Sequence, residues 1–184
     1  MAELDPDVVR LTGDYLPEVR GDAFEDPRVE LVIGDAAAFV ASAQERFDLV
    51  VFDLTPPDSP AAGLYTPAFY AALKRVMSAG ALVSLHLGSP FHHGQRVGAL
   101  LGGLRAAFAV VRPLAAYVPL YGSLWLMAIA SDTLDPACVN EATLQARAAE
   151  RQIEGLRYYD PRLHAALLKG SCAARDKLGE FLQL

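Results

Sequence analysis

The sequence predicts an α/β fold in which a doubly wound, mostly parallel sheet is closed by an antiparallel hairpin. Short apolar strands alternate with segments of helical spacing between residues 29 and 108, which indicates strand–helix–strand units. Two further strands, expected at 110–118 and 124–131, are joined by a turn that contains proline and glycine, as in a hairpin. No repeat, low-complexity tract or linker interrupts the 184 residues, so we expect one domain over residues 1–184.

The first part of the chain is expected to form a helix and then two strands separated by a second helix. Residues 4–16 carry apolar side chains at helical spacing, with Pro6 at a tolerated first-turn position. A polar loop follows. The remaining elements are a strand at 29–33, a helix at 36–43 and a strand at 47–53.

The segment after this strand is rich in proline and is expected to stay extended over residues 54–65, because proline prevents an immediate helix. Thr66 and Pro67 pair a helix cap with a first-turn proline, so a helix should run from there to about Met77 and end at residues 78–80. The later elements, apart from the hairpin, are a strand at 81–86, a helix at 94–108 and a helical tail, clearest at 142–156.

Composition narrows the class of protein. A hydrophobic content of 53% predicts a globular chain, and a net charge of −6 argues against a nucleic-acid partner. The same acidic balance suits a cationic substrate. An uncharged stretch separates Arg112 from Asp132, but prolines and a glycine break it, so a buried hairpin is preferred to a membrane span.

The N-terminus shows no export signal, and Cys138 and Cys172 lack metal-ligand spacing. We therefore expect a cytoplasmic protein with reduced cysteines. The pair His92-His93 has no third ligand at sensible spacing, so we expect no metal site.

Acidic residues follow several of the predicted strands. Asp53 closes the apolar run 49–52, Asp35 follows the strand at 29–33, and Glu3 stands where an earlier strand would have ended. Parallel strands end at one edge of a sheet, where open α/β folds bind ligands. Three carboxylates on such a rim suit a ligand rich in hydroxyls and amines, such as a nucleoside or a polyamine. For Asp53 taken alone, capping of a loop is an equally good interpretation.

Several segments together resemble the polyamine aminopropyltransferases, of which spermidine synthase is the type. The resembling segments occur in family order, at residues 3–6, 26–35, 53–65, 118–122 and 157–160 with His164. A generic methyltransferase would share the acidic strand ends but not the proline-rich loop or the Tyr158-Tyr159 pair. The resemblance implies a Rossmann-like, class I methyltransferase-like fold that assembles as a homodimer or homotetramer.

The resemblance also implies a nucleoside site for decarboxylated S-adenosylmethionine, the co-substrate. Glu3 resembles the acid that binds the ribose hydroxyls, and Asp35 resembles the residue that reads the adenine amino group. Ala36 stands where the family usually has glycine. The apolar wall against the adenine would comprise Pro60, Ala61 and Leu64.

On the amine side, Asp53 resembles the catalytic acid that orients the attacking amine and accepts its proton, and Tyr121 resembles the tyrosine that hydrogen-bonds the amine. The family's second acid, three residues later, is replaced by Pro56, and Asp58 is the candidate to supply that charge. His86 stands where many members have glutamine, and we expect it to be a neutral hydrogen-bonding residue rather than a base.

The largest departure is at the N-terminus, where the family's β-rich region, first strand and Gly-rich acidic loop have no counterpart. That strand would lie between the strands ending at Glu3 and Asp53. Met1, just before the acid, suggests a truncated reading frame or an excised fragment.

The expected function is transfer of an aminopropyl group to a diamine such as putrescine, giving spermidine and methylthioadenosine, with no nucleic-acid or membrane partner. Two alternatives stay open: a non-catalytic remnant that binds nucleoside weakly or only oligomerises, and a methyltransferase that uses S-adenosylmethionine.

Overall fold

The computed structural model describes residues 1–169 and residue 179, and it divides into two compact units, Met1–Arg46 and Phe47–Leu184. Each unit is described by itself. The expectation of one domain over the whole chain stays a prediction. Cys172 lies outside the described residues, whereas Cys138 is an exposed free cysteine.

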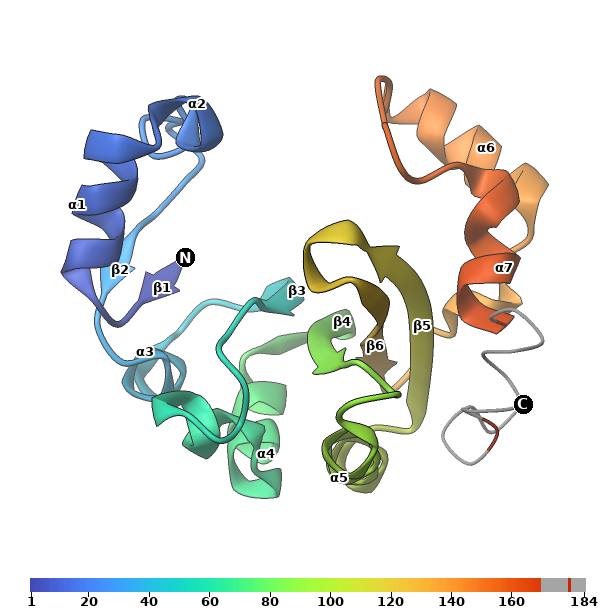
Figure 1. Ribbon diagram of the computed structural model, residues 1–184, viewed down its shortest axis with the longest axis horizontal. Coiled ribbons are helices and arrows are strands. Elements are labelled where there is room, and N and C mark those ends of the chain that lie inside the picture. The colour runs from blue at the N-terminus through green and yellow to red at the C-terminus, as the bar shows by residue number, and fades with distance from the viewer. Residues whose placement is uncertain (170–178, 180–184) are drawn as a thin grey trace. The chain divides into compact units, whose positions relative to one another are not determined.

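The first unit contains a small parallel sheet and three helices (Figure 1). Strands β1 (Ala2–Glu3) and β2 (Val32–Ile33) pair in parallel, so that Glu3 lies opposite Ile33. The helices are α1 (Pro6–Tyr15), α2 (Pro17–Arg20) and α3 (Ala36–Ser42).

The helix predicted at 4–16 is shorter than expected and begins at Pro6. The Asp5 carboxylate accepts a hydrogen bond from the Asp7 amide at 2.9 Å and so caps the helix from outside it. The helix ends at Tyr15, and Pro17 starts the short α2. The strand predicted at 29–33 pairs only at its last two residues, because its partner β1 is itself two residues long.

The second unit is built on a four-stranded mixed sheet in the order β3-β4-β6-β5. Strand β3 (Phe47–Phe52) pairs in parallel with β4 (Met77–Gly88). Strand β6 (Ser123–Ser131) lies antiparallel to β4 on one side and to β5 (Val110–Val118) on the other. The predicted C-terminal hairpin of β5 and β6 is therefore confirmed.

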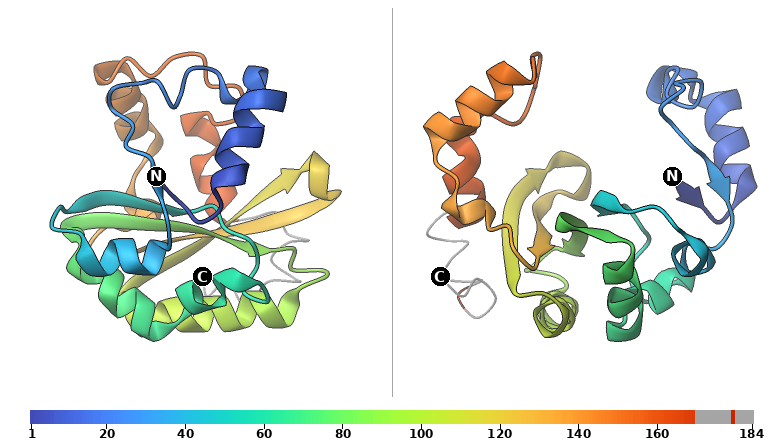
Figure 2. Two further views of the ribbon diagram at one scale, coloured as in Figure 1. Left: turned by 90° about the vertical axis from the view of Figure 1, so that its left-hand side faces the viewer. Right: turned by 180° about the vertical axis from the view of Figure 1, so that it is seen from behind.

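Helices α4 (Pro67–Arg75) and α5 (Gly94–Ala107) lie together on one face of this sheet (Figures 1 and 2). Helix α7 (His164–Lys169) packs against β5, next to α6 (Glu141–Glu150). Four 3-10 helices complete the unit, η1 (Pro60–Tyr65), η2 (Pro119–Tyr121), η3 (Pro136–Cys138) and η4 (Pro161–Leu163).

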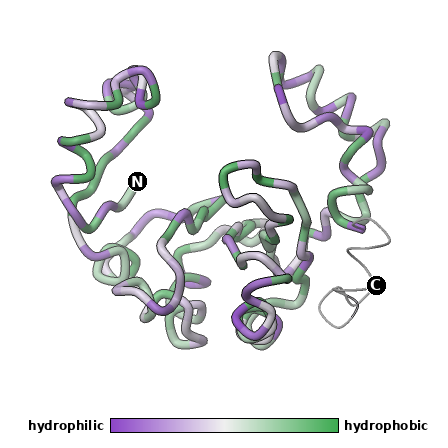
Figure 3. The backbone as a smooth tube through the Cα atoms, in the orientation of Figure 1, coloured by the Kyte–Doolittle hydropathy of each residue, from purple (hydrophilic) through white to green (hydrophobic). Residues whose placement is uncertain are grey.

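The core of the second unit lies between its sheet and helices α4 and α5. Hydrophobic residues follow the strands of this sheet (Figure 3). The largest fully buried apolar side chains are Tyr70, Leu73, Leu85, Leu87, Leu101, Leu104 and Leu126. Tyr70 and Phe52 approach each other edge to face, with ring centroids 6.4 Å apart. This packing fixes the end of β3, the strand that Asp53 follows.

Three predicted boundaries in this unit were wrong. The segment 78–80 was expected to end a helix, but it belongs to β4, which begins at Met77 because the Phe47 amide donates to the Val76 carbonyl at 2.8 Å. The loop 54–65 is not extended throughout, since residues 60–65 form η1. The tail helix ends at Glu150, because Gln152 takes a left-handed conformation with φ of 53°.

The helices in the described part of the chain were searched for a membrane span. None of them is both long enough and apolar enough to cross a bilayer.

Candidate active site

Asp53 follows directly on β3 and lines a cavity of about 430 Å³ in the second unit. The cavity is built from the proline-rich loop, the end of β4, helix α5 and the β5–β6 hairpin. The side chains that concern its chemistry are Asp53, Thr55, Tyr65, His86, Arg96, Tyr121 and Trp125. Asp53, His86 and Tyr121, three of the predicted amine-side residues, therefore share one cavity.

The Asp53 carboxylate is open to solvent, with 89% of its side chain exposed. Its Oδ1 lies 3.8 Å from Nε2 of His86, which comes from the neighbouring strand β4. Because the carboxylate is neither buried nor consumed by a strong ion pair, it is free to meet a cationic or hydrogen-bonding ligand.

His86 is held by the single tryptophan of the chain. The Trp125 indole N–H donates to His86 Nδ1 at 3.0 Å, across the antiparallel pair β4 and β6. The Tyr121 ring packs against the same tryptophan, with ring centroids 4.2 Å apart and an interplanar angle of 33°. The tyrosine predicted to hydrogen-bond the amine is thus packed on the residue that fixes His86.

The proline-rich loop is folded back on itself. The Tyr65 hydroxyl donates to the Thr55 carbonyl at 3.0 Å, and the Thr55 and Ser59 hydroxyls lie 2.7 Å apart. Burial raises the pKa of Tyr65, with nearby Asp53 acting in the same direction and Arg96 in the opposite one. Tyr65 therefore stays a neutral hydroxyl at the edge of the cavity.

Asp58, the predicted replacement for the family's second acid, is not among the residues that line the cavity. Its carboxylate lies 3.5 Å from the guanidinium of Arg96, which does line the cavity. The loop carboxylate is thus paired with an arginine that helix α5 brings to the cavity.

The predicted nucleoside-binding acids lie in the first unit, at the ends of its two parallel strands. Glu3 Oε1 accepts a hydrogen bond from the Asp5 amide at 2.9 Å, and Asp35 Oδ1 accepts one from the Ala37 amide at 2.8 Å. Asp35 caps α3, of which Ala36 is the first residue. The three residues of the predicted apolar wall all lie in η1 of the second unit, namely Pro60, Ala61 and Leu64.

Sequence reasoning missed Arg96 and Trp125. Arg96 lies in the first turn of α5, the helix that follows β4, and from there its side chain reaches the cavity. Helical spacing alone does not show which residues of a helix reach a cavity at the end of a sheet. Alternation along β6 places Trp125 on the same face as Met127, and Met127 lies opposite His86, but this leads to Trp125 only once the strand pairing is known. The needed signal was the pairing of β6 with β4.

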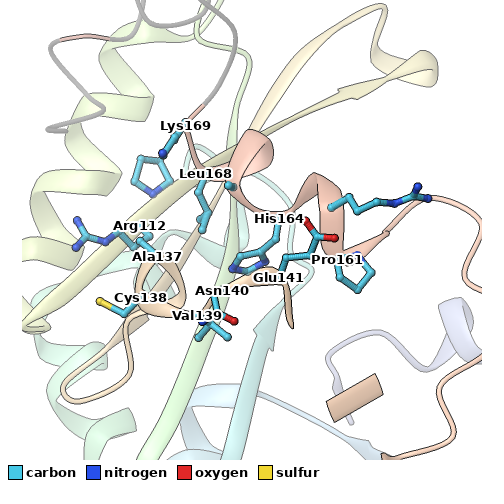
Figure 4. Close-up of a pocket in the computed structure, with 13 residues that line it drawn as sticks. Arg112, Ala137, Cys138, Val139, Asn140, Glu141, Pro161, His164, Leu168 and Lys169 are labelled. Atoms are coloured by element: carbon cyan, nitrogen blue, oxygen red, sulfur yellow. The ribbon is translucent and has the colours of Figure 1, made fainter. Parts of the chain in front are cut away.

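A second cavity, of about 560 Å³, lies between β5, α6 and α7 and shares no lining residue with the first (Figure 4). Two of its polar side chains already have protein partners. Arg112 pairs with Asp135, and His164 contacts the Tyr159 hydroxyl at 3.0 Å and the Pro136 carbonyl at 2.8 Å. Within the described residues, no group of three or more His, Cys, Asp or Glu side chains could hold a metal ion.

The fold and the acidic strand ends define a Rossmann-like protein of the class I methyltransferase type. Comparison with known proteins then gives the family, because residues 1–145 match the model of the spermine/spermidine synthase domain. The chain belongs to this family. It is 45% identical over 168 residues to a polyamine aminopropyltransferase of Nitrosomonas europaea, and 36% identical over 169 residues to one of Korarchaeum cryptofilum. Each match covers 91% of this chain and 52% of the relative, so the chain spans about half the length of these relatives.

Solved structures confirm the predicted fold class. The crystal structure of spermidine synthase from Thermotoga maritima matches with a TM-score of 0.80 and 23% identity, over 98% of this chain and 60% of that one. Human methyltransferase-like protein 13 in complex with SAH matches with a TM-score of 0.59 and 19% identity, over 86% of this chain and 72% of that one. The chain thus shares its fold with both of these proteins.

Proposed function

We propose that this chain carries the amine-activating site of an aminopropyltransferase, which moves the aminopropyl group of decarboxylated S-adenosylmethionine onto a diamine such as putrescine. The observation that carries the proposal is the position of Asp53. Its carboxylate is exposed at the end of a parallel strand and lines a cavity with Tyr121 and His86. Membership of the spermine/spermidine synthase family supports the same reaction.

The acceptor amine must give up a proton as it attacks, because an ammonium nitrogen has no lone pair to form the new bond. An alkyl ammonium has a pKa near that of lysine, about 10.4, so forming the free amine near neutral pH costs roughly 3–5 kcal/mol. A carboxylate placed beside the nitrogen offsets this cost by taking the proton as attack proceeds, an effect of roughly 10²–10⁴ in rate. Asp53 is the carboxylate in position to do this, and the Tyr121 hydroxyl can hold the nitrogen beside it.

The group transfer is a substitution at carbon. The amine lone pair forms a bond to the methylene next to the sulfonium, and the carbon–sulfur bonding pair returns to sulfur. The ammonium proton passes to Asp53 and then to water. Since the leaving group, methylthioadenosine, is a neutral thioether, no second acid is required. Holding amine and sulfonium in line lowers the barrier further, by up to about 7–11 kcal/mol.

For the nucleoside part we propose the residues that the resemblance implies. Glu3 and Asp35 would accept hydrogen bonds from ribose and adenine, beside Ala36. A spermidine synthase of the same fold was solved with the transition-state analogue AdoDATO, which supports a nucleoside co-substrate for the family's fold. Replacing Glu3 with Gln should weaken methylthioadenosine binding in calorimetry without altering the Asp53 cavity.

The decisive experiment supplies decarboxylated S-adenosylmethionine and putrescine to the chain and measures methylthioadenosine. Asp53→Asn should abolish turnover and leave methylthioadenosine binding nearly intact, because the amide keeps the shape of the carboxylate but accepts no proton. Asp48→Asn is the matched control, since Asp48 is exposed on the same strand and lines neither cavity. Turnover retained by Asp53→Asn would refute the assignment.

A second function, a binding remnant without catalysis, stays open as an alternative. Calorimetry with methylthioadenosine separates the possibilities. Heat of methylthioadenosine binding without turnover identifies a nucleoside-binding remnant. If no heat is measured even at high protein concentration, the alternative that remains is a remnant that only oligomerises. Turnover with S-adenosylmethionine but not with its decarboxylated form would identify a methyltransferase.

A further inference from the structure

The contact between Trp125 and His86 fixes which nitrogen of the imidazole carries the proton. An indole N–H is a donor only, and it lies 3.0 Å from His86 Nδ1. Nδ1 must therefore present its lone pair, because an N–H there would face the indole N–H. The remaining ring proton is on Nε2, so the hydrogen-bond network assigns the neutral Nε2–H tautomer to His86.

The donor ring has little freedom to move. Trp125 stands on β6, where the neighbouring residue Leu126 pairs with Gly88 of β4 across an irregularity in the ladder between His86 and Gly88. One side of the indole is covered by the Tyr121 ring, and the His93 ring meets it edge to face with centroids 6.1 Å apart. The tautomer of His86 is thus set by a packed residue rather than by solvent.

Nε2 is also the ring nitrogen that lies near the proposed catalytic carboxylate. Asp53 Oδ1 lies 3.8 Å from Nε2, and within the described part of the chain His86 is the one basic side chain at ion-pair distance from this carboxylate. At 3.8 Å the contact is longer than a hydrogen bond, and a small rotation of the exposed carboxylate would bring one of its oxygens within reach of the N–H. The second oxygen is then free for an incoming amine.

We propose that Trp125 and His86 are positioning residues for Asp53: the indole locks His86 as an Nε2–H donor, and that donor orients the carboxylate. The proposal rests on the proposed function, in which Asp53 takes the proton of the amine. It assigns His86 a role in which neither proton transfer nor charge is needed. A glutamine at position 86 could fill the same role, since its amide offers one acceptor and one donor at opposite corners.

The tautomer can be measured without any turnover. In a chain with ¹⁵N-labelled histidine, a long-range proton–nitrogen spectrum should show a pyridine-type Nδ1 and a protonated Nε2 for His86, assigned by the signal lost in His86→Gln. In Trp125→Phe, which keeps an aromatic ring but loses the donor, the two tautomers should mix. A protonated Nδ1 in the wild-type chain, or an unchanged spectrum in Trp125→Phe, would overturn the proposal.

The orientation of Asp53 is the second readout. Three-bond couplings should report one χ1 rotamer for Asp53 in the wild-type chain and averaging in His86→Leu. Turnover should fall roughly tenfold or more in kcat for His86→Leu and Trp125→Phe, with the KM for putrescine little changed, because a misplaced catalytic group costs rate rather than ground-state binding. His86→Gln should recover most of the rate, and His92→Gln, in an exposed position outside the cavity, should match the wild type.

The two proposals fail in different ways. If the wild-type chain shows no turnover, the proposed function fails, and the tautomer and the Asp53 couplings still decide whether the pair positions the carboxylate. If turnover is normal in His86→Leu, the positioning proposal fails while the proposed function stands.

Discussion

The guanidinium of Arg96 lies 3.5 Å from the Asp58 carboxylate, and the arginine lines the cavity into which Asp53 opens. Arg96 stands on α5 and Asp58 in the proline-rich loop, so the contact joins two separate walls of the site. Where the resemblance implies a second acid, this sequence has Pro56. The far ammonium of a diamine would therefore meet an arginine next to the nearest substitute carboxylate.

Replacing Arg96 with Gln should strengthen binding of a diamine. The change removes a positive charge from the cavity and releases Asp58, which is 73% exposed and can then turn to the second ammonium. We expect the KM for putrescine to fall about threefold to tenfold, equivalent to roughly 1 kcal/mol for a partly exposed charge pair. Steady-state kinetics at low salt measures the effect, which should shrink as salt is added. Arg147→Gln is the control, and an equal effect there would show a response to net charge only.

Tyr70 is the next test, because its hydroxyl is buried without a partner. The side chain is 0% exposed, the hydroxyl has no hydrogen-bond partner within the described residues, and burial raises the pKa of Tyr70 to about 12. Tyr70→Phe keeps the ring contacts and removes an unsatisfied polar group, so the free energy of unfolding should rise by roughly 1 kcal/mol. Urea denaturation followed by circular dichroism measures it. The control Tyr158→Phe changes an exposed ring and should shift stability by less than about 0.5 kcal/mol.

Glycines in the second unit offer a paired test of backbone conformation. Gly102 is helical and exposed, and an added methyl would meet nothing within 4 Å. Gly102→Ala should therefore stabilise the chain by roughly 0.5–1 kcal/mol. Gly122 has the same open surroundings but a φ of +58°, so Gly122→Ala should destabilise by about 1 kcal/mol. Thermal unfolding measures both variants, and we expect Tm to rise in Gly102→Ala and to fall in Gly122→Ala. Shifts of Tm with the same sign in both variants would contradict this account.

Most of the second unit could be predicted because its signals are local. The strand at 47–52 is apolar and ends in an acid, and Thr66 caps α4 by accepting a hydrogen bond from the Phe69 amide, as the Thr-Pro pair indicated. The hairpin strands are found almost at the residues expected. Where local signals misled, pairing decided the outcome: residues 78–80 resemble a helix terminus, but they continue a strand that begins beside Phe47.

In the candidate site, too, some residues could be predicted from local signals and others could not. Asp53, His86 and Tyr121 could be placed near one another because each ends a predicted strand or turn at a single edge of the sheet. The partners that define their chemistry could not, since the contact of Trp125 with His86 spans 39 residues and that of Arg96 with Asp58 spans 38. The contact of Trp125 with His86 follows from the strand order, in which β6 lies between β4 and β5. Sequence spacing carries no sign of that order.

The ion pair of Arg112 and Asp135 makes stability depend on pH in the acid range. Hydrogen bonds from Arg112 lower the pKa of Asp135 from 3.8 to about 2, so the folded state binds this proton less readily than the unfolded state. The resulting stabilisation is fully present above about pH 4 and is lost as the pH falls towards 2. Because the guanidinium is partly exposed, we expect the pair to contribute roughly 1 kcal/mol to the free energy of unfolding rather than the full linkage value.

The variant Asp135→Asn tests this pH dependence, because its side-chain oxygen can still cap η3 but carries no charge. Its free energy of unfolding, measured with urea between pH 7 and 2.5, should fall less steeply with acid than that of the wild type. The exposed Asp22→Asn serves as the control, and parallel acid curves for wild type and Asp135→Asn would show that the pair contributes nothing to this dependence.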